Sequence, residues 1–229
     1  MEYLSTRNDK ISEKFEHIFI KGLSDDGGLF LPKQIKKLSD KEFLNLRNLS
    51  YVDLATEIIS RFTGDFCSNE KLHQIVKKSY STFNEHNVVK IKKVEDLHVL
   101  ELFHGPTLAF KDVAMQLIGN FYEYYLSKNT KKINIIVATS GDTGAAAIDA
   151  VKGKKNINIF VLHPNNRISP VQRMLMTTNP SKNVFNIAVE GNFDDCQKLV
   201  KEMFSDIEFS KSINMSGVSS INWARIVAQ

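Results

Sequence analysis

The alternation of strand-like and helix-like segments after residue 90 constrains the fold of this chain most strongly. Apolar runs rich in β-branched residues predict strands at 133–138, 157–162 and 184–189. Helical spacing of apolar residues predicts helices at 112–127, 145–151, 171–178 and 194–204. Runs of the first kind are typical of parallel strands buried on both faces, and their alternation with helices favours βαβ units. The sequence therefore predicts an α/β fold with a parallel sheet.

The first ninety residues have a different pattern. Apolar residues at helical spacing predict helices at 50–62 and 68–83, each after a serine that can cap it. We therefore expect a mainly helical subdomain over residues 1–90 and an α/β domain over residues 91–229. A short apolar strand is expected at 99–103. The final segment, 221–229, begins an amphipathic helix with no glycine or proline to end it, so we expect the chain to be cut inside a domain.

Composition excludes several classes of protein. The chain has 229 residues, of which 42% are hydrophobic and 24% charged, as in a soluble globular protein. Its net charge of +4 comes from scattered lysines without a basic stripe, so no nucleic-acid partner is expected. The two cysteines are far apart and lack metal-ligand spacing, which argues against a disulfide framework and a metal site. We find no signal peptide and no apolar run of membrane-spanning length, so we expect a cytoplasmic protein with no membrane partner.

One candidate site is the segment Thr139–Gly144, TSGDTG, between a predicted strand and a predicted helix. Glycines let a ligand approach the backbone, and free N–H groups at a helix start attract a carboxylate or a phosphate. The segment matches neither the phosphate-binding P-loop nor the dinucleotide-binding fingerprint. A plain turn between strand and helix remains the alternative.

The second candidate is Lys111, which follows Leu108-Ala109-Phe110 and precedes a predicted helix. A lysine at a helix start opposes the helix dipole, and partial burial disfavours its charged form. Both effects favour the neutral amine that forms a Schiff base. The alternative is a surface lysine beside Asp112. For the neighbouring His104, a role in positioning the loop is favoured over proton transfer.

Longer blocks of the sequence resemble a known family. These blocks are ELFHGPTLAFKDVAMQL, ATSGDTGAAAIDA, SPVQRMLMTT, EGNFDDCQKLVKEMF and SSINWARI, and the N-terminal STRN and DDGGLFLP add to them. Together they resemble threonine synthases of bacterial type, in order along the whole chain. That family consists of pyridoxal 5′-phosphate enzymes of fold type II, which are similar to the tryptophan synthase β chain. The resemblance therefore implies a lyase of threonine biosynthesis.

The resemblance also implies roles for individual residues. Lys111 matches the lysine that binds pyridoxal phosphate as a Schiff base, and it would also serve as the catalytic base and acid. Asp142 stands where related enzymes often have Asn beside the cofactor's 3′-oxygen, so we expect the two oxygens to share a proton. Substrate carboxylate contacts are implied for Thr139, Ser140, Gly141, Thr143 and Gly144. Phosphate contacts are implied for Ser220, Asn222 and Arg225, where arginine suits bidentate binding.

The implied reaction converts O-phospho-L-homoserine and water into L-threonine and phosphate. In the family, a later glycine-rich loop binds the cofactor phosphate and a later hydroxyl residue faces the pyridine nitrogen. Neither has a match in this chain, since Glu190-Gly191-Asn192-Phe193 belongs to a different block. We therefore expect the chain to be the N-terminal portion of the enzyme and to be inactive alone. The sequence does not indicate an oligomeric state.

Three alternatives remain open. A threonine-synthase-like phospho-lyase would release 2-oxobutyrate from the same substrate, and an amino-acid dehydratase would have the same fold. A non-catalytic module would bind a small anion at residues 139–144 and leave Lys111 unmodified. Product analysis separates the first two from a threonine synthase, and the visible absorption of a lysine-bound cofactor separates an enzyme from a binding module.

Overall fold

The computed structural model describes all residues, 1–229, and is built around a parallel sheet. Its four strands lie in the order β8-β7-β6-β9, and every neighbouring pair is parallel. They are β6 (Ile133–Ala138), β7 (Ile157–Pro164), β8 (Val184–Val189) and β9 (Met215–Ser216). The α/β fold with parallel βαβ units is therefore confirmed.

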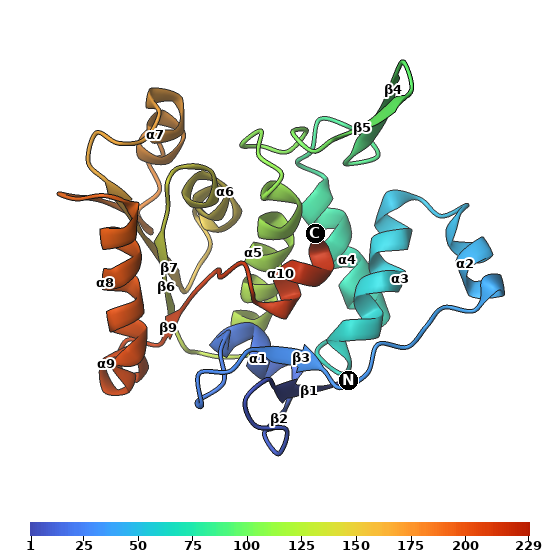
Figure 1. Cartoon of the computed structure of the whole chain (residues 1–229), viewed down its shortest axis with the longest axis horizontal. Coiled ribbons are helices and arrows are strands. Elements are labelled where there is room, and N and C mark those ends of the chain that lie inside the picture. The colour runs from blue at the N-terminus through green and yellow to red at the C-terminus, as the bar shows by residue number, and fades with distance from the viewer.

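Helices cover both faces of this sheet (Figure 1). They are α5 (Asp112–Ser127), α6 (Asp142–Val151), α7 (Pro170–Thr177), α8 (Phe193–Ser205) and α9 (Ile207–Ser212). Because successive side chains of a strand point to opposite faces, Ile135 and Val137 join the core that includes α5 and α6. Ile136 and Leu162 pack instead against Cys196 of α8. Burial on both faces explains why β6 and β7 read as continuous apolar runs.

Residues 1–90 contain helices and a small antiparallel sheet. The sheet order is β2-β1-β3, and the elements are β1 (Glu2–Ser5), β2 (Ser12–Lys14), α1 (Phe15–Lys21), β3 (Phe30–Pro32), α2 (Asp40–Leu46), α3 (Tyr51–Thr63) and α4 (Asn69–Tyr80). The predicted helices correspond to α3 and α4, which are capped by the Ser50 and Ser68 side chains. The sheet was not predicted, because strands of three or four residues are too short to show alternation.

A hairpin of β4 (Lys90–Val94) and β5 (Leu97–Glu101) projects from the body of the molecule (Figure 1). The strand prediction for 99–103 was therefore displaced by two residues, and β4 was missed. Every residue of β4 is exposed, and three of its five residues are lysines. A strand with no buried face lacks the alternation from which strands are predicted.

One hydrophobic core extends across residue 90. Phe15, Phe19 and Phe66 from the first part contact Phe121 of α5, with ring centres 5.3–5.9 Å apart. The last helix, α10 (Trp223–Ala228), packs against α5, α3 and α1. The two predicted parts of the chain are thus joined by shared packing, and the division at residue 90 stays a prediction. None of the helices has the combined length and apolarity that crossing a bilayer requires.

Candidate active site

Lys111 lies at the end of a loop that a buried carboxylate holds in place. The next residue, Asp112, is fully buried and accepts hydrogen bonds from the backbone N–H of Thr107 at 2.8 Å and its hydroxyl at 2.6 Å. Burial raises the pKa of the Asp112 carboxyl above its ordinary value. The two bonds close the loop 107–112 and fix the direction in which Lys111 leaves the backbone.

The Lys111 amine has an acidic and an aromatic neighbour. Its Nζ lies 3.8 Å from Oδ2 of Asp142 and 4.3 Å from the centre of the Phe110 ring. The Lys111 side chain is 18% exposed, so it is screened from bulk water without being sealed from it. An amine in this position remains accessible to a small molecule.

The TSGDTG segment forms the start of α6. The helix begins at Asp142, three residues before the predicted start, because the last three residues of the segment already form its first turn. The buried hydroxyl of Thr139 accepts hydrogen bonds from the N–H groups of Gly141 and Gly144, both at 2.9 Å. Thr139 therefore lies beneath the segment and caps the helix. The N–H groups of Ser140 and Thr143 have no acceptor within the protein.

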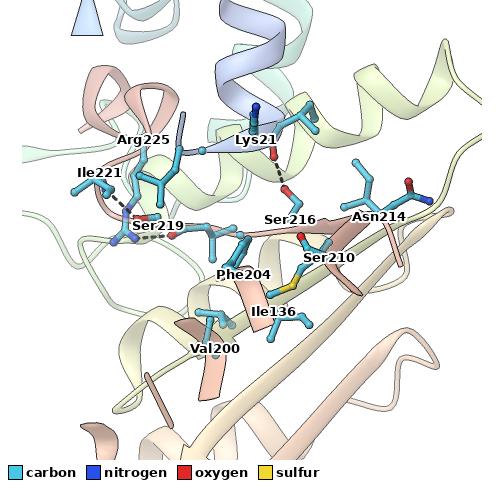
Figure 2. A pocket seen from close by; sticks show the side chains of 18 of the residues that line it. Lys21, Ile136, Val200, Phe204, Ser210, Asn214, Ser216, Ser219, Ile221 and Arg225 are labelled. Atoms are coloured by element: carbon cyan, nitrogen blue, oxygen red, sulfur yellow. Dashed lines mark hydrogen bonds between the residues drawn. The ribbon is translucent and has the colours of Figure 1, made fainter. Parts of the chain in front are cut away.

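An open cleft of about 2050 Å³ is lined by residues from both predicted sites. Among its lining residues are Lys111, Thr143, Ser220 and Arg225. Figure 2 shows one part of this cleft, with Arg225 beside Ser219 and Ile221. The remaining predicted site residues do not line it: Thr139, Ser140, Gly141, Asp142, Gly144 and Asn222. The fold thus brings the lysine and the predicted phosphate-binding arginine to one surface, although they are 114 positions apart in the sequence.

Arg225 is a buried cation without a carboxylate partner. Its side chain donates to the carbonyl of Val218 at 3.0 Å and to Oε1 of Gln229 at 2.9 Å, and the residue is 4% exposed. No Asp or Glu oxygen lies within 4.0 Å of it, and burial lowers the pKa of its guanidinium. A buried charge is costly unless it is paired. An anion in the cleft would supply the missing partner.

Comparisons with known proteins identify similar sequences and structures. Residues 2–80 match the family model described as "Threonine synthase N terminus". The chain is 44% identical to a threonine synthase of Eremothecium gossypii and 42% identical to one of Pseudomonas aeruginosa, which cover 99% and 100% of it. A solved threonine synthase of Brucella melitensis, described as bound to PLP, superposes with a TM-score of 0.92 at 45% identity and covers 100% of this chain. Over its whole length the chain is similar to threonine synthases. It spans 48% and 49% of the lengths of the two relatives and 49% of the solved chain, about half in each case.

Asn222, which the sequence predicted to contact a phosphate, has a structural role. Its Oδ1 caps α10 by accepting from the N–H of Ala224 at 3.0 Å. Its amide donates to the carbonyl of Phe19 at 2.8 Å and, more weakly, to that of Ile18 at 3.4 Å. Both ends of the side chain are therefore engaged inside the protein. Asn222 holds α10, and with it Arg225, against α1.

Two residues of the site were missed in the sequence. Gln172 donates from Nε2 to Oδ1 of Asp142, and its only sequence signal is the helix-start pattern Ser169-x-x-Gln172. Thr107 was quoted within a family block without a role, and its signal is an acid five residues later. His104 contacts Glu101 through Nε2 at 3.0 Å, which agrees with the predicted role in positioning the loop.

Proposed function

We propose that this chain forms the lysine and anion-binding side of a pyridoxal 5′-phosphate-dependent threonine synthase site. The observation that carries the proposal is the shared cleft, whose lining includes both Lys111 and the buried Arg225. The substrate would be O-phospho-L-homoserine, which offers an amine, a carboxylate and a phosphate. The products would be L-threonine and inorganic phosphate, and the protein would act in the cytoplasm.

The residues present fit this cofactor and substrate. Covalent attachment of an aldehyde needs an accessible lysine amine, and Lys111 lines the cleft with 18% of its side chain exposed. Gly141, with φ +141°, lies where a Cβ would overlap the amide of Gln172, so the segment is a close-packed cradle that only glycine allows. The unpaired N–H groups of Ser140 and Thr143 suit a carboxylate. The unpaired charge of Arg225 suits a phosphate ester.

Each residue would make a separate contribution to the reaction. When bound, pyridoxal phosphate supplies an electron sink that stabilises negative charge on the substrate's α-carbon. Lys111 would take the proton from that carbon at Nζ and later return a proton to the substrate. Thr143 and Ser140 would orient the carboxylate, while Thr139, Gly141 and Gly144 shape their backbone. Asp142 would accept a shared proton from the cofactor's 3′-oxygen.

The phosphate end of the site depends on the first part of the chain. Ser220 and Arg225 would bind the phosphate directly, and Asn222 would act by holding α10 on α1 through the Phe19 carbonyl. Every residue assigned to ligands belongs to residues 91–229, and residues 1–90 would serve as the support. This separation of roles is the functional reason for proposing two parts.

Covalent labelling tests the lysine assignment. The chain is incubated with pyridoxal 5′-phosphate, reduced with borohydride, digested and analysed by mass spectrometry. We expect the reduced label on Lys111 at low cofactor concentration, and loss of that label in Lys111→Ala. Lys128→Ala, which changes the lysine at the other end of α5, is the matched control. In this variant Lys111 should carry the label as in the parent chain. A label spread evenly over surface lysines, or unchanged in Lys111→Ala, would refute the assignment.

Phosphate-ester binding tests the arginine assignment. Calorimetric titration of the cofactor-free chain with O-phospho-L-homoserine should give a dissociation constant at least tenfold weaker for Arg225→Gln, since a charge-assisted hydrogen bond contributes about 1.5–3 kcal/mol. Arg173→Gln, on the exposed side of α7, is the control and should bind as the parent does. Equal affinities for both variants would contradict the assignment.

A further inference from the structure

The side chain of Gln172 connects α7 to the first turn of α6. The two helices pack against each other, and Gln172 occupies the third position of α7. A Cβ at Gly141 would overlap the Gln172 side-chain amide, so the contact depends on the absence of a side chain at that position. Gln172 therefore lies directly over the turn that presents Asp142.

The orientation of the Gln172 amide is set by Ser169. The Ser169 hydroxyl caps α7 by accepting from the backbone N–H of Gln172 at 3.2 Å, and it lies 3.1 Å from Oε1 of the same residue. A hydroxyl has one hydrogen to give, and Oε1 can only accept it. The carbonyl end of the amide is thus held toward Ser169. The NH2 end is left to point at Asp142.

The two oxygens of Asp142 face different partners. Oδ1 accepts from Nε2 of Gln172, while Oδ2 lies 3.8 Å from Nζ of Lys111. Asp142 is the only acidic residue within 4.0 Å of that amine, since the neighbouring Asp112 carboxylate is turned to Thr107. The Asp142 side chain is 45% exposed and has no other side-chain bond, so without Gln172 it would be free to rotate into solvent.

We propose that Gln172 is a positioning residue of the lysine site, which acts by holding Asp142 with one oxygen directed at Lys111. Its catalytic meaning rests on the proposed function, in which Lys111 is the reacting amine. The contact itself does not depend on a cofactor. Ser169, Gln172, Asp142 and Lys111 form one directed chain in which each member fixes the orientation of the next.

The test measures the reactivity of Lys111 in the cofactor-free chain. Isotope-coded acetic anhydride modifies the neutral amine, and mass spectrometry compares Lys111 with Lys128 of the same molecule at fixed pH. A carboxylate near a partly exposed ammonium favours the charged form by the small amount typical of such pairs. We therefore expect Gln172→Leu to raise the relative rate at Lys111 about two- to fivefold. Gln197→Leu, a glutamine of α8 with no side-chain bond, is the control and should change nothing.

A double-mutant cycle separates positioning from a general structural effect. If Gln172 acts through Asp142, then Asp142→Asn raises the Lys111 rate by a similar factor, and Gln172→Leu adds nothing to it. Additive effects, or a rate for Gln172→Leu equal to that of the parent chain, would overturn the proposal. Gln172→Met provides a second variant if Gln172→Leu does not fold. It keeps the length of the side chain and cannot donate to Asp142, so a similar rate increase is expected.

The outcome is distinguishable from a failure of the proposed function. If pyridoxal phosphate does not label Lys111 in the parent chain, the proposed function is refuted, regardless of the anhydride rates. If the label is found and the rates do not respond to Gln172, only the positioning role fails. If the anhydride rates respond to Gln172→Leu but Lys111 is not labelled, the contact between Gln172 and Asp142 is confirmed and its proposed role in catalysis is refuted.

Discussion

Replacing Thr139 with valine removes the acceptor that organises the first turn of α6. The side chains are nearly equal in size, so the core around the 1% exposed Thr139 is preserved. The N–H groups of Gly141 and Gly144, which both reach the Thr139 hydroxyl at 2.9 Å, lose their partner. Each unsatisfied buried donor costs about 1–3 kcal/mol. Because water can reach the exposed side of the turn, we expect the free energy of unfolding to fall by about 2–4 kcal/mol in total.

Urea unfolding followed by circular dichroism measures this change. Thr143→Val is the matched control, because Thr143 lies in the same turn and its hydroxyl makes no hydrogen bond. We expect this variant to stay within about 0.5 kcal/mol of the parent chain, as is usual for substitutions outside such networks. Thr139→Ser keeps the acceptor and should lose much less stability than Thr139→Val. If Thr139→Val and Thr143→Val unfold at the same urea concentration, Thr139 does not organise the turn.

Three further changes test the packing and electrostatics around the site. Gly119→Ala places a Cβ against the Ala150 carbonyl where α5 meets α6, so urea unfolding should show a loss of about 1–3 kcal/mol despite the better helix propensity of alanine. Asn222→Asp keeps the helix-capping oxygen and loses the amide that donates to the Phe19 carbonyl. We expect the free energy of unfolding to fall by about 1–3 kcal/mol, and an unchanged value would exclude the proposed tie between α10 and α1. Burial raises the pKa of the Asp112 carboxyl above its ordinary value of 3.8. The greater proton affinity of the folded chain therefore stabilises it fully below pH 3.8, and this stabilisation is lost as the pH rises through the folded-state pKa. The stability of the parent chain relative to Asp112→Asn should therefore fall as the pH rises from 3.8 through the folded-state pKa, and a rise over that range would contradict the shift.

The parts of the fold with strong periodicity were predictable from the sequence. The bounds of α5, β6 and β8 agree with the predicted ranges at both ends. Burial dictates the spacing of the apolar residues in α5 and β6, whereas β8 has no buried residue and was predicted from its run of apolar, β-branched residues. The hairpin strand β4 and the short strands β1 to β3 lack such a face and were missed.

The candidate site was predictable only where one short segment carries the chemistry. Lys111 and residues 139–144 were found because a lysine and a glycine-containing turn each follow a recognisable pattern. The bond between Gln172 and Asp142 joins residues 30 positions apart, and that between Asn222 and Phe19 joins residues 203 apart. Such contacts depend on how helices pack, which local spacing does not encode. For this reason the role of Asn222 in tying α10 to α1 emerged only from the structure.

A crystal structure of the chain after incubation with pyridoxal 5′-phosphate and borohydride reduction tests the central claim most directly. The claim is that the Lys111 amine and the Arg225 guanidinium are two ends of one ligand site. We predict continuous density from Lys111 Nζ into the cleft, with the ring beside Asp142 and free space extending to Arg225. Density attached to another lysine, or a ligand bound outside this cleft, would contradict the claim.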